Sequence, residues 1–358
     1  MAKKEGKPKK SIGYVIRVLC VILGLIAGVL LYFYYAFGRT YVNIPILSDE
    51  EYATMQLSES GSLTGGDVES AWKDGGHTRI FFDPAHPIIE VAQKDPNVEN
   101  ILVFGIDSRK TSDYKCRSDA MMIVSINKEL KTVKLTSLMR DTGVYIGDTD
   151  ATAKTKLDKL NAAYAYGGVG LMINTINRNF DLDIQRFVML DFSSAAEIID
   201  LCGGVEITVS AAEVKYANEF LAYQNKYTGS NTPNISSSGR QTLTGNQAVS
   251  WSRIRYLDSD FVRTSRQRTI AQALIEKVAD MNFFEQVRLL ERSTGVFETN
   301  MQPQDLARVG FNGISGSKNL TQYRLPEDNM FTVQSNPWMM IIDFEQTRAR
   351  LHNYIWGT

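Results

Sequence analysis

The stretch Ile101 to Asp141, ILVFGIDSRKTSDYKCRSDAMMIVSINKELKTVKLTSLMRD, carries the strongest fold signal in the chain. It contains three apolar runs of strand length, at residues 101–106, 120–126 and 132–138. Short apolar runs bounded by polar residues are typical of buried β-strands. The polar turn NKELK between the second and third runs predicts a β-hairpin.

Charged residues stand at one end of these predicted strands. Asp107 follows the first strand, Asp119 precedes the second and Arg140 follows the third. If the first two strands are antiparallel neighbours, all three residues lie on one rim of the sheet. Residues that a rigid scaffold holds at strand ends commonly form functional sites. The sequence therefore predicts a site where two carboxylates and an arginine converge.

The residues after this stretch alternate between helix and strand patterns. LNAAYAYGGVGLMINTINRNF favours a helix, IQRFVML a strand, SSAAEIIDLCGG a helix that ends at two glycines, and VEITVS a strand. Such alternation indicates an α/β layered domain. The composition of residues 227–239, YTGSNTPNISSSG, predicts a loop.

A second signal is the arginine-rich stretch at residues 253–268, RIRYLDSDFVRTSRQR. The helix that follows has its core face marked by apolar residues at four-residue spacing, Ile270, Leu274 and Val278. Extending this face backwards places Arg263 near its centre, with Arg266 at its edge and Gln267 alongside. An inward arginine must meet an anion or a carboxylate, because an unpaired buried charge is strongly unfavourable.

Composition shows that this positive cluster is local. The 358-residue chain is 44% hydrophobic and has a formal net charge of only −1. It can bury a full-sized core. A general nucleic-acid-binding protein would be basic overall, so we expect no nucleic-acid partner.

The N-terminus predicts a membrane anchor. Five lysines precede residues 18–38, an uncharged run that is long enough to cross a bilayer as a helix. The lysines favour the cytoplasm, so the rest of the chain would lie outside the cell. A cleaved signal peptide is the alternative. The predicted organisation is a cytoplasmic tail at 1–17, a transmembrane helix at 18–38, an extracellular stalk or small appendage at 39–95 and a catalytic domain at 96–358.

Other motifs exclude several chemistries. No Cys or His spacing matches a zinc site, and no Lys-Ser or Lys-Thr pair follows the glycines at 167–170 as a nucleotide P-loop would require. The three histidines lie far from every motif. An oxidising exterior would permit a bridge between Cys116 and Cys202, but the sequence does not establish their distance.

The rim and the arginine helix together supply the charged members of one predicted pocket: Asp107, Asp119, Arg117, Arg140, Arg253, Arg255, Arg263 and Arg266. Guanidinium groups form paired hydrogen bonds to phosphate oxygens, and Mg²⁺ prefers one or two carboxylates together with phosphates. The combination points to phosphoryl transfer. The alternative is that these groups neutralise one another as surface ion pairs.

Six ordered blocks of the sequence are similar to the LytR-CpsA-Psr family. They are GIDSR at 105–109, RSDAMMIVSI at 117–126, SLMRDTGVYI at 137–146, KLNAAYAYGG at 159–168, IIDLCGGVEI at 198–207 and LTGNQAVSWSRIRYLDSDFVRTSRQR at 243–268. The resemblance implies an α/β/α layered domain with a central mixed sheet behind one N-terminal transmembrane helix. It also implies an extracellular enzyme that moves a glycopolymer from a polyprenyl-pyrophosphate carrier to peptidoglycan through a phosphodiester. Wall teichoic acids and capsular polysaccharides are the usual cargo.

Roles carried over from this resemblance fall into three groups. Asp107 and Asp119 would hold Mg²⁺, or Mn²⁺ in its place. The catalytic residues would be Arg140, Asp141, Arg263 and Arg266, with Asp141 orienting Arg140 or acting as a base. The pyrophosphate would be bound by Arg117, Arg140, Arg253, Arg255, Arg263 and Arg266, with Asp260 and Gln267 in support. The family usually has proline where Met139 stands, which puts the rigidity of the Arg140 turn in question.

Two other functions remain open at this point. Arginines alone would serve a membrane-anchored binding or regulatory protein that captures lipid-linked anionic polymers. The acid pair argues against this, because carboxylates weaken anion capture unless a cation lies between. A polyprenyl-pyrophosphate hydrolase differs from the transferase only in its acceptor, which is water.

Overall fold

A six-stranded mixed sheet forms the centre of the molecule. The computed structural model describes residues 38–58, 80–107, 116–148, 156–255, 257 and 259–357. The strand order is β11-β8-β3-β4-β5-β12. The bounds of these strands are β3 Val98–Ile106, β4 Ser118–Asn127, β5 Thr132–Leu138, β8 Arg186–Asp191, β11 Glu298–Thr299 and β12 Leu320–Leu325.

The pairing confirms the topology that the sequence predicts. β3 pairs antiparallel with β4, and β4 pairs antiparallel with β5. β8 and β12 join parallel to β3 and β5, respectively. The ends of β3 and β5 and the start of β4 therefore meet at one edge of the sheet, as the positions of Asp107, Asp119 and Arg140 require.

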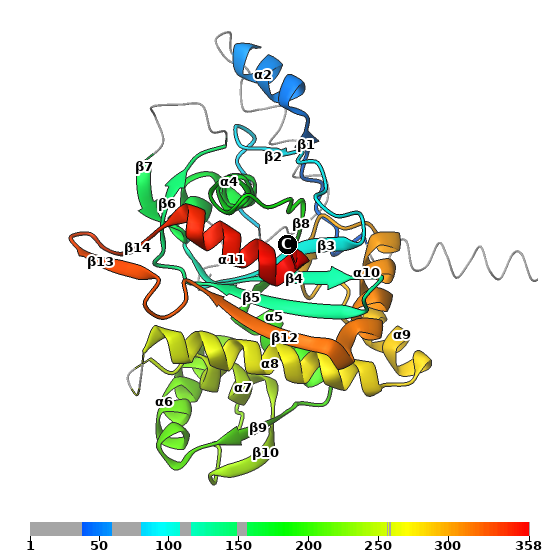
Figure 1. The fold of residues 1–358 in the computed structure, drawn as a ribbon. Coiled ribbons are helices and arrows are strands. Elements are labelled where there is room, and N and C mark those ends of the chain that lie inside the picture. Colours follow the sequence, from blue (N-terminus) through cyan, green and yellow to red (C-terminus); the bar gives the residue numbers. More distant parts are fainter. Residues whose placement is uncertain are drawn as a thin grey trace, which may run out of the picture.

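Helices cover both faces of the sheet (Figure 1). On one face lie α4 (Ala162–Phe180) and α11 (Phe344–Trp356), whose Ile173 and Leu351 pack with Leu102 of the sheet. On the other face, α8 (Asp260–Asp280) and α10 (Pro303–Gly316) pack against Ile101 and Leu135. The expected layered α/β domain is thus observed.

A smaller cluster of elements packs against the other side of α8. It contains α5 (Phe192–Leu201), β9 (Val205–Val209), α6 (Ala211–Thr228), β10 (Gly239–Leu243) and α7 (Gly245–Ser252). Their apolar side chains enclose Ile270 and Leu274, which confirms the predicted core face of α8. The sequence does not predict α6, which takes in the first two residues of the predicted 227–239 loop. The remaining short elements are β1 Ile46–Leu47, α2 Asp49–Ser58, β2 Ile88–Ile89, β6 Gly143–Ile146, β7 Lys156–Lys159, α9 Phe283–Arg292, the 3₁₀ turn Ser317–Asn319, β13 Phe331–Ser335 and β14 Trp338–Ile342.

The structure corrects one expectation about residues 39–95. Their described parts are not a separate stalk or appendage, since Val42, Ile44 and Ile88 are buried in the main core. Thr40 and Val42 exchange backbone hydrogen bonds with Thr299 of β11, at 3.0 and 2.8 Å. The domain therefore begins well before residue 96.

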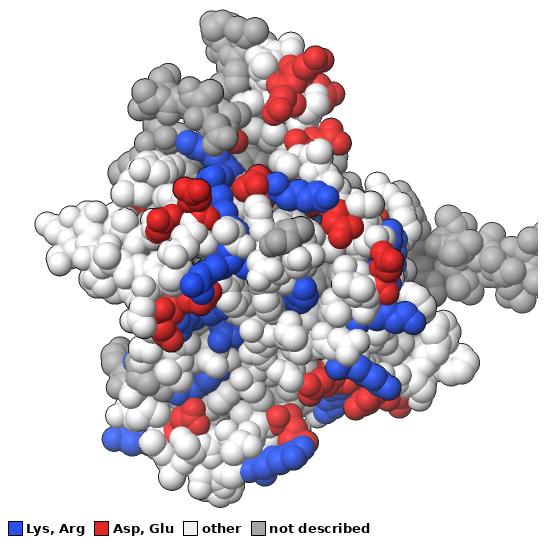
Figure 2. Space-filling model, viewed as in Figure 1, with Lys and Arg blue, Asp and Glu red and all other residues white. Residues whose placement is uncertain are grey.

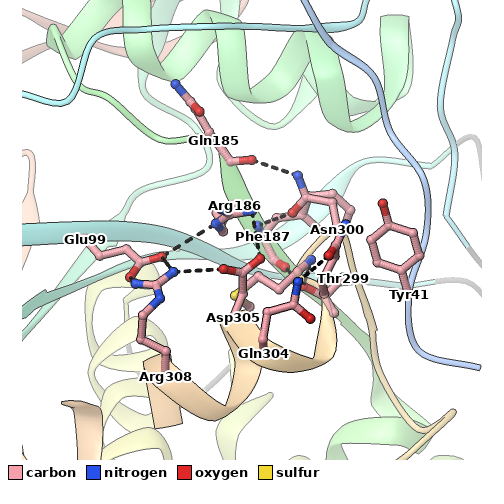
Figure 3. A network of polar contacts seen from close by, with 12 residues as sticks. Tyr41, Glu99, Gln185, Arg186, Phe187, Thr299, Asn300, Gln304, Asp305 and Arg308 are labelled. Carbon is pink, nitrogen blue, oxygen red and sulfur yellow. Dashed lines mark hydrogen bonds and ion pairs between the residues drawn. The ribbon is translucent and has the colours of Figure 1, made fainter. Parts of the chain in front are cut away.

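A polar network links β3, β8, α10 and the residue after β11 at this sheet edge, beside Tyr41 of the entering segment (Figure 3). The guanidinium of Arg186 lies 3.6 Å from the Glu99 carboxylate and 3.4 Å from Asp305 of α10. The side-chain oxygen of Asn300 accepts a hydrogen bond from the N–H of Phe187 at 3.1 Å. Its amide nitrogen donates to the carbonyl of Gln185, the residue before β8, at 2.8 Å. These contacts hold α10 and the residue that follows β11 against β8 and β3.

Three other expectations can be compared with the structure. Within the described residues, Cys116 and Cys202 are not joined by a disulfide, so the bridge that the sequence left open is not formed. A side chain on Gly170 would meet the backbone oxygen of His86 at 1.7 Å, so this glycine allows α4 to pack closely against residue 86. The predicted tail and, apart from Gly38, the predicted transmembrane helix lie outside the described residues. Within the described residues, every helix is too short or too polar to cross a bilayer.

Candidate functional site

The two candidate metal-binding carboxylates lie at the end of the central strand pair. Asp107 directly follows β3. Gly105 pairs with Ala120 but Ile106 pairs with Ser118, so Asp119 is the extra residue of a β-bulge. A bulge re-aims a side chain at a sheet edge, and here it lets the Asp119 carboxylate meet two arginines.

The turn that carries Arg140 and Asp141 is held by hydrogen bonds from separate segments. Its peptides accept from the N–H groups of Asn161, at 3.1 Å to Arg140, and of Met340, at 3.0 Å to Asp141. The N–H of Met139 donates to the carbonyl of Leu325 at 2.8 Å, a bond that proline could not form. These bonds supply a rigidity that does not depend on proline at position 139.

Arg140 lies among three carboxylates. Its guanidinium is 2.7 Å from Asp119, 3.4 Å from Asp141 and 3.7 Å from Asp260 of α8. Burial opposes the charge, but Asp260, Asp119 and Asp141 outweigh it and raise the pKa of Arg140. The side chain is therefore a permanent cation held at the sheet edge.

Arg263 is the most deeply buried cation of the cluster, with 3% of its surface exposed. It pairs with Asp260 at 2.9 Å and donates to the backbone oxygen of Asp119 at 3.4 Å. Its Nε is buried and has no hydrogen-bond partner. Burial, together with the neighbouring cations Arg140 and Arg255, lowers the pKa of Arg263 to about 10, although the carboxylates of Asp260 and Asp119 act in the opposite direction. The group is charged at neutral pH, and a bound anion would stabilise it.

Two further arginines follow α7. Arg253 lies 3.8 Å from Asp107, and its guanidinium carbon is 3.9 Å from the centre of the Phe192 ring. Arg255 lies 3.5 Å from Asp119 and is exposed. Ion pairs thus join Asp119, Arg140, Asp141, Arg255, Asp260 and Arg263 into one cluster. The Asp107–Arg253 pair adjoins it along the chain, since Asp107 follows β3 at the edge where Asp119 lies and Arg253 is two residues from Arg255.

The other predicted site residues lie differently. Arg266 is buried, as the helix pattern predicts, but it forms a 2.8 Å ion pair with Glu213 of α6. Its guanidinium also faces the Trp251 ring at 5.7 Å. Gln267 is half-buried on the next position of α8, and Arg117 is exposed at the entry to β4. Direct contact of these three with the cluster is not observed among the described residues.

Lys159 belongs to the cluster although the sequence analysis assigned it no role. Its amine lies 2.7 Å from Asp141 and 5.5 Å from the centre of the Trp338 ring. Because Asp141 contacts Lys159 with one oxygen and Arg140 with the other, it is placed to orient Arg140. The only sequence signal was the position of Lys159 in the KLNAAYAYGG block.

A divalent cation fits the donor set only with help from a ligand. Among the described residues, no group of three His, Cys, Asp or Glu side chains could hold a metal alone. Asp107 and Asp119 provide two carboxylates, and each now faces arginine. Mg²⁺ is commonly bound by one or two carboxylates plus phosphate oxygens and water. The two aspartates therefore suit an ion that shares a phosphorylated ligand.

Basic side chains gather on this face between the β13–β14 hairpin and the N-terminal end of α8, with acidic ones beside them (Figure 2). Arg140, Lys159, Arg253, Arg255 and Arg263 are the cations in contact with the four cluster carboxylates. Fork-shaped donors from three segments of the chain can surround an anion with several oxygens. A diphosphate has this character.

Comparisons with known proteins agree with this architecture. A family model described as the LytR_cpsA_psr family matches residues 69–352. The chain is 27% identical over 259 residues to Biofilm regulatory protein A of Streptococcus mutans, covering 70% of this chain and 62% of that protein. It is 31% identical over 193 residues to the polyisoprenyl-teichoic acid–peptidoglycan teichoic acid transferase TagU of Bacillus cereus, covering 53% and 55%. The chain thus spans about three fifths of the length of these relatives.

A solved structure shares the fold. The LytR-CPS2A-psr family protein YwtF (TagT) with bound octaprenyl pyrophosphate lipid superimposes with a TM-score of 0.54 at 22% identity. The match covers 75% of this chain and 95% of that one.

Proposed function

Because this chain belongs to the LytR-CpsA-Psr family, we propose that it is a glycopolymer phosphotransferase. It would move a glycopolymer from a polyprenyl-pyrophosphate carrier to peptidoglycan and leave polyprenyl phosphate. The names of the teichoic acid transferase relatives and the lipid bound in the related structure support this substrate class. One observation in this chain carries the proposal: buried Arg263 and half-buried Arg140 both contact Asp119 at a single sheet edge.

The proposed reaction is a single displacement at phosphorus. An acceptor sugar hydroxyl attacks the phosphorus nearer the glycan, loses its proton, and forms a new P–O bond. The bond from that phosphorus to the bridging oxygen breaks, and polyprenyl phosphate leaves. Arg140, Arg253 and Arg263 neutralise charge on the pyrophosphate as it shifts toward the leaving group.

Positioning residues keep these cations in place. Asp260 holds both Arg140 and Arg263, and Asp141 holds Arg140 while it is itself held by Lys159. Asp107 and Asp119 would hold Mg²⁺, which would supply further positive charge to the phosphate oxygens. Preorganised charge of this kind is usually the largest contribution to phosphoryl transfer.

The proposed location is the outer face of the cell membrane. Residues 18–38 would form a single transmembrane helix behind a cytoplasmic N-terminus, and the described domain would face the cell wall. This topology rests on the apolar run and the lysines before it.

The test is reconstitution of the full chain with a polyprenyl-pyrophosphate-linked glycan, peptidoglycan fragments and Mg²⁺. Transfer produces polyprenyl phosphate and a glycan–peptidoglycan phosphodiester in equal amounts. Release of polyprenyl phosphate with free glycan phosphate would identify a hydrolase. Binding of the donor without either product would identify a capture protein, and both outcomes would overturn the proposal.

A further inference from the structure

Helix α9, Phe283–Arg292, presents an apolar end to solvent at one corner of the molecule. Phe283 and Phe284 are 71% and 79% exposed, and none of the ten residues of α9 is fully buried. Their ring centroids lie 5.8 Å apart, so they form one contiguous surface. In Figure 2 the outermost part of the α8–α9 corner carries no charged side chain.

The start of α9 is built to hold these rings outward. Asn282 accepts from the N–H groups of Phe284 and Glu285, and the Glu285 side chain accepts from the N–H of Asn282. This capping box defines the first turn of the helix. Two adjacent phenylalanines fixed in water are unfavourable, and exposed apolar patches commonly mark an interaction surface.

The position of residues 39–40 indicates what kind of partner would cover the exposed rings of Phe283 and Phe284. The predicted membrane span ends at Gly38, and the next residues are fastened beside the end of α9. The N–H of Gly295 donates to the Thr40 hydroxyl at 2.8 Å. A side chain on Gly295 would lie 3.5 Å from Cβ of Arg39. The first residues of the described domain therefore lie beside Gly295, which comes three residues after the end of α9.

The exposed positive charges around α9 would also suit a lipid surface. Arg39, Arg288 and Arg292 are exposed near the end of the helix, and the aromatic rings are at its start. Amphipathic helices that lie in a membrane interface combine apolar rings with arginines on the polar face. The negatively charged headgroups of phospholipids would complement these arginines.

We propose that α9 lies on the outer leaflet of the bilayer, with Phe283 and Phe284 inserted among the lipids. This inference rests on the membrane anchoring given in the proposed function. It sets the orientation of the domain, because α8 separates α9 from the arginine cluster (Figure 1). The 21 residues of α8 span about 30 Å, so the cluster lies at the opposite end of this helix from the lipid surface.

Photocrosslinking tests the contact without requiring catalysis. The full chain, with Phe284→p-benzoylphenylalanine, is reconstituted in vesicles of phosphatidylglycerol and phosphatidylethanolamine and irradiated. Mass spectrometry should find lipid adducts at position 284. The matched control is Tyr223→p-benzoylphenylalanine, since Tyr223 is 72% exposed on α6, away from α9.

The outcomes separate the possible occupants. Lipid adducts at position 284 several-fold above those at position 223 support the proposal. Equal yields at the two positions overturn it, and crosslinks between two copies of the chain instead identify a self-association surface. All three results stand whether or not the chain transfers glycopolymer.

A substitution measures the consequence for activity. The double variant Phe283→Ser and Phe284→Ser removes only exposed rings, so the fold should survive, as circular dichroism can verify. We expect a fall of about tenfold in turnover of a bilayer-embedded donor and unchanged turnover of a water-soluble short-chain donor. An equal loss with both donors would assign the rings to the reaction itself and overturn the membrane role.

Discussion

At the scale of single residues, the candidate site is an arrangement of charges in which Asp119 and Asp260 hold Arg140 and Arg263. Arg263 is 3% exposed, yet its Nε has no hydrogen-bond partner. Asp260 and Asp119 offset part of the cost of burying this cation. Buried charges are normally paired and fully hydrogen-bonded, so the remaining donor capacity points to a ligand.

The first prediction concerns Arg263. Arg263→Ala should lower the rate of glycopolymer transfer on the order of 10³-fold, because a cation that stabilises the transferring phosphoryl group is lost. Arg263→Lys should recover little of the lost transfer rate, since an ammonium group cannot form paired hydrogen bonds. The measurement is kcat in the reconstituted transfer assay. Arg240→Ala is the control, because Arg240 pairs with Glu206 on the exposed surface. An equal effect of both alanine variants would remove the proposed role.

The second prediction concerns the metal. Asp107→Asn should abolish Mn²⁺ binding in the presence of a pyrophosphate ligand, as measured by electron paramagnetic resonance, because one of two carboxylate ligands becomes neutral. The rate of glycopolymer transfer should also fall at least 100-fold. The Mg²⁺ concentration that gives the half-maximal rate should rise. Asp328→Asn serves as the control, since Asp328 is an exposed carboxylate that pairs with Arg324. Unchanged Mn²⁺ binding in the Asp107 variant would contradict the assignment.

At the scale of elements, α8 joins the two parts of the domain. Its Arg263 reaches the sheet edge, whereas Arg266, one turn later, reaches Glu213 on α6. Glu213 is also the third residue of α6 and completes the capping box with Ser210. One carboxylate therefore fixes both the start of α6 and the position of α8.

A third prediction follows from this carboxylate. Burial opposes its charge, but hydrogen bonds from Ser210 and Arg266 outweigh burial and lower the pKa of Glu213. A lowered folded pKa contributes stability above the unfolded value of 4.5, and this contribution is lost as pH falls through the folded pKa. Glu213→Gln should therefore lower the free energy of unfolding by about 2 kcal/mol at pH 7.

The difference between Glu213→Gln and wild type should shrink below pH 4.5, where protonation removes the same charge from the wild-type chain. Urea denaturation at a series of pH values measures it. Glu206→Gln provides a comparison, since Glu206 lies in an exposed pair. A pH-independent difference for the Glu213 variant would show that packing, and not charge, explains its effect.

At the scale of the whole molecule, the segment that follows the predicted membrane span is part of the core. Val42 and Ile44 are each 5% exposed, and Thr40 and Val42 bond to β11. The proposed anchor, residues 18–38, would therefore lead directly into core residues. Under the proposed membrane anchoring, this direct attachment would give α9 and the arginine cluster a defined orientation above the bilayer.

The fourth prediction tests that attachment. Ile44→Ala should lower the free energy of unfolding by about 2–5 kcal/mol, because a buried methyl-rich side chain leaves a cavity. Val333→Ala, at a position that is 53% exposed, should change it by less than about 0.5 kcal/mol. Chemical denaturation of the full chain in detergent micelles measures both. If both variants changed the free energy of unfolding by the same small amount, residues 39–95 would behave as an independent stalk.

Much of the fold and the site could be predicted from local patterns. The apolar runs predicted three strands and a hairpin between the second and third. The antiparallel pairing of the first two was only a condition in the sequence, and the structure shows it, which places Asp107, Asp119 and Arg140 at one edge. The periodicity of α8 correctly predicted that Arg263 and Arg266 are buried. Both patterns report which side of an element is buried, which is a property of the sequence itself.

Only the tertiary structure decided which partner each buried charge contacts. Periodicity turned Arg263 and Arg266 inward alike, yet one meets Asp119 and the other meets Glu213, because α8 lies between two separate groups of elements. In the same way, Lys159 joins the site through Asp141, and residues 40–44 enter the core through β11. The sequence by itself determined which residues are charged and which face of each periodic element is buried. Contacts between segments distant in the chain determined their partners, since such contacts depend on the packing of whole elements and leave no local pattern.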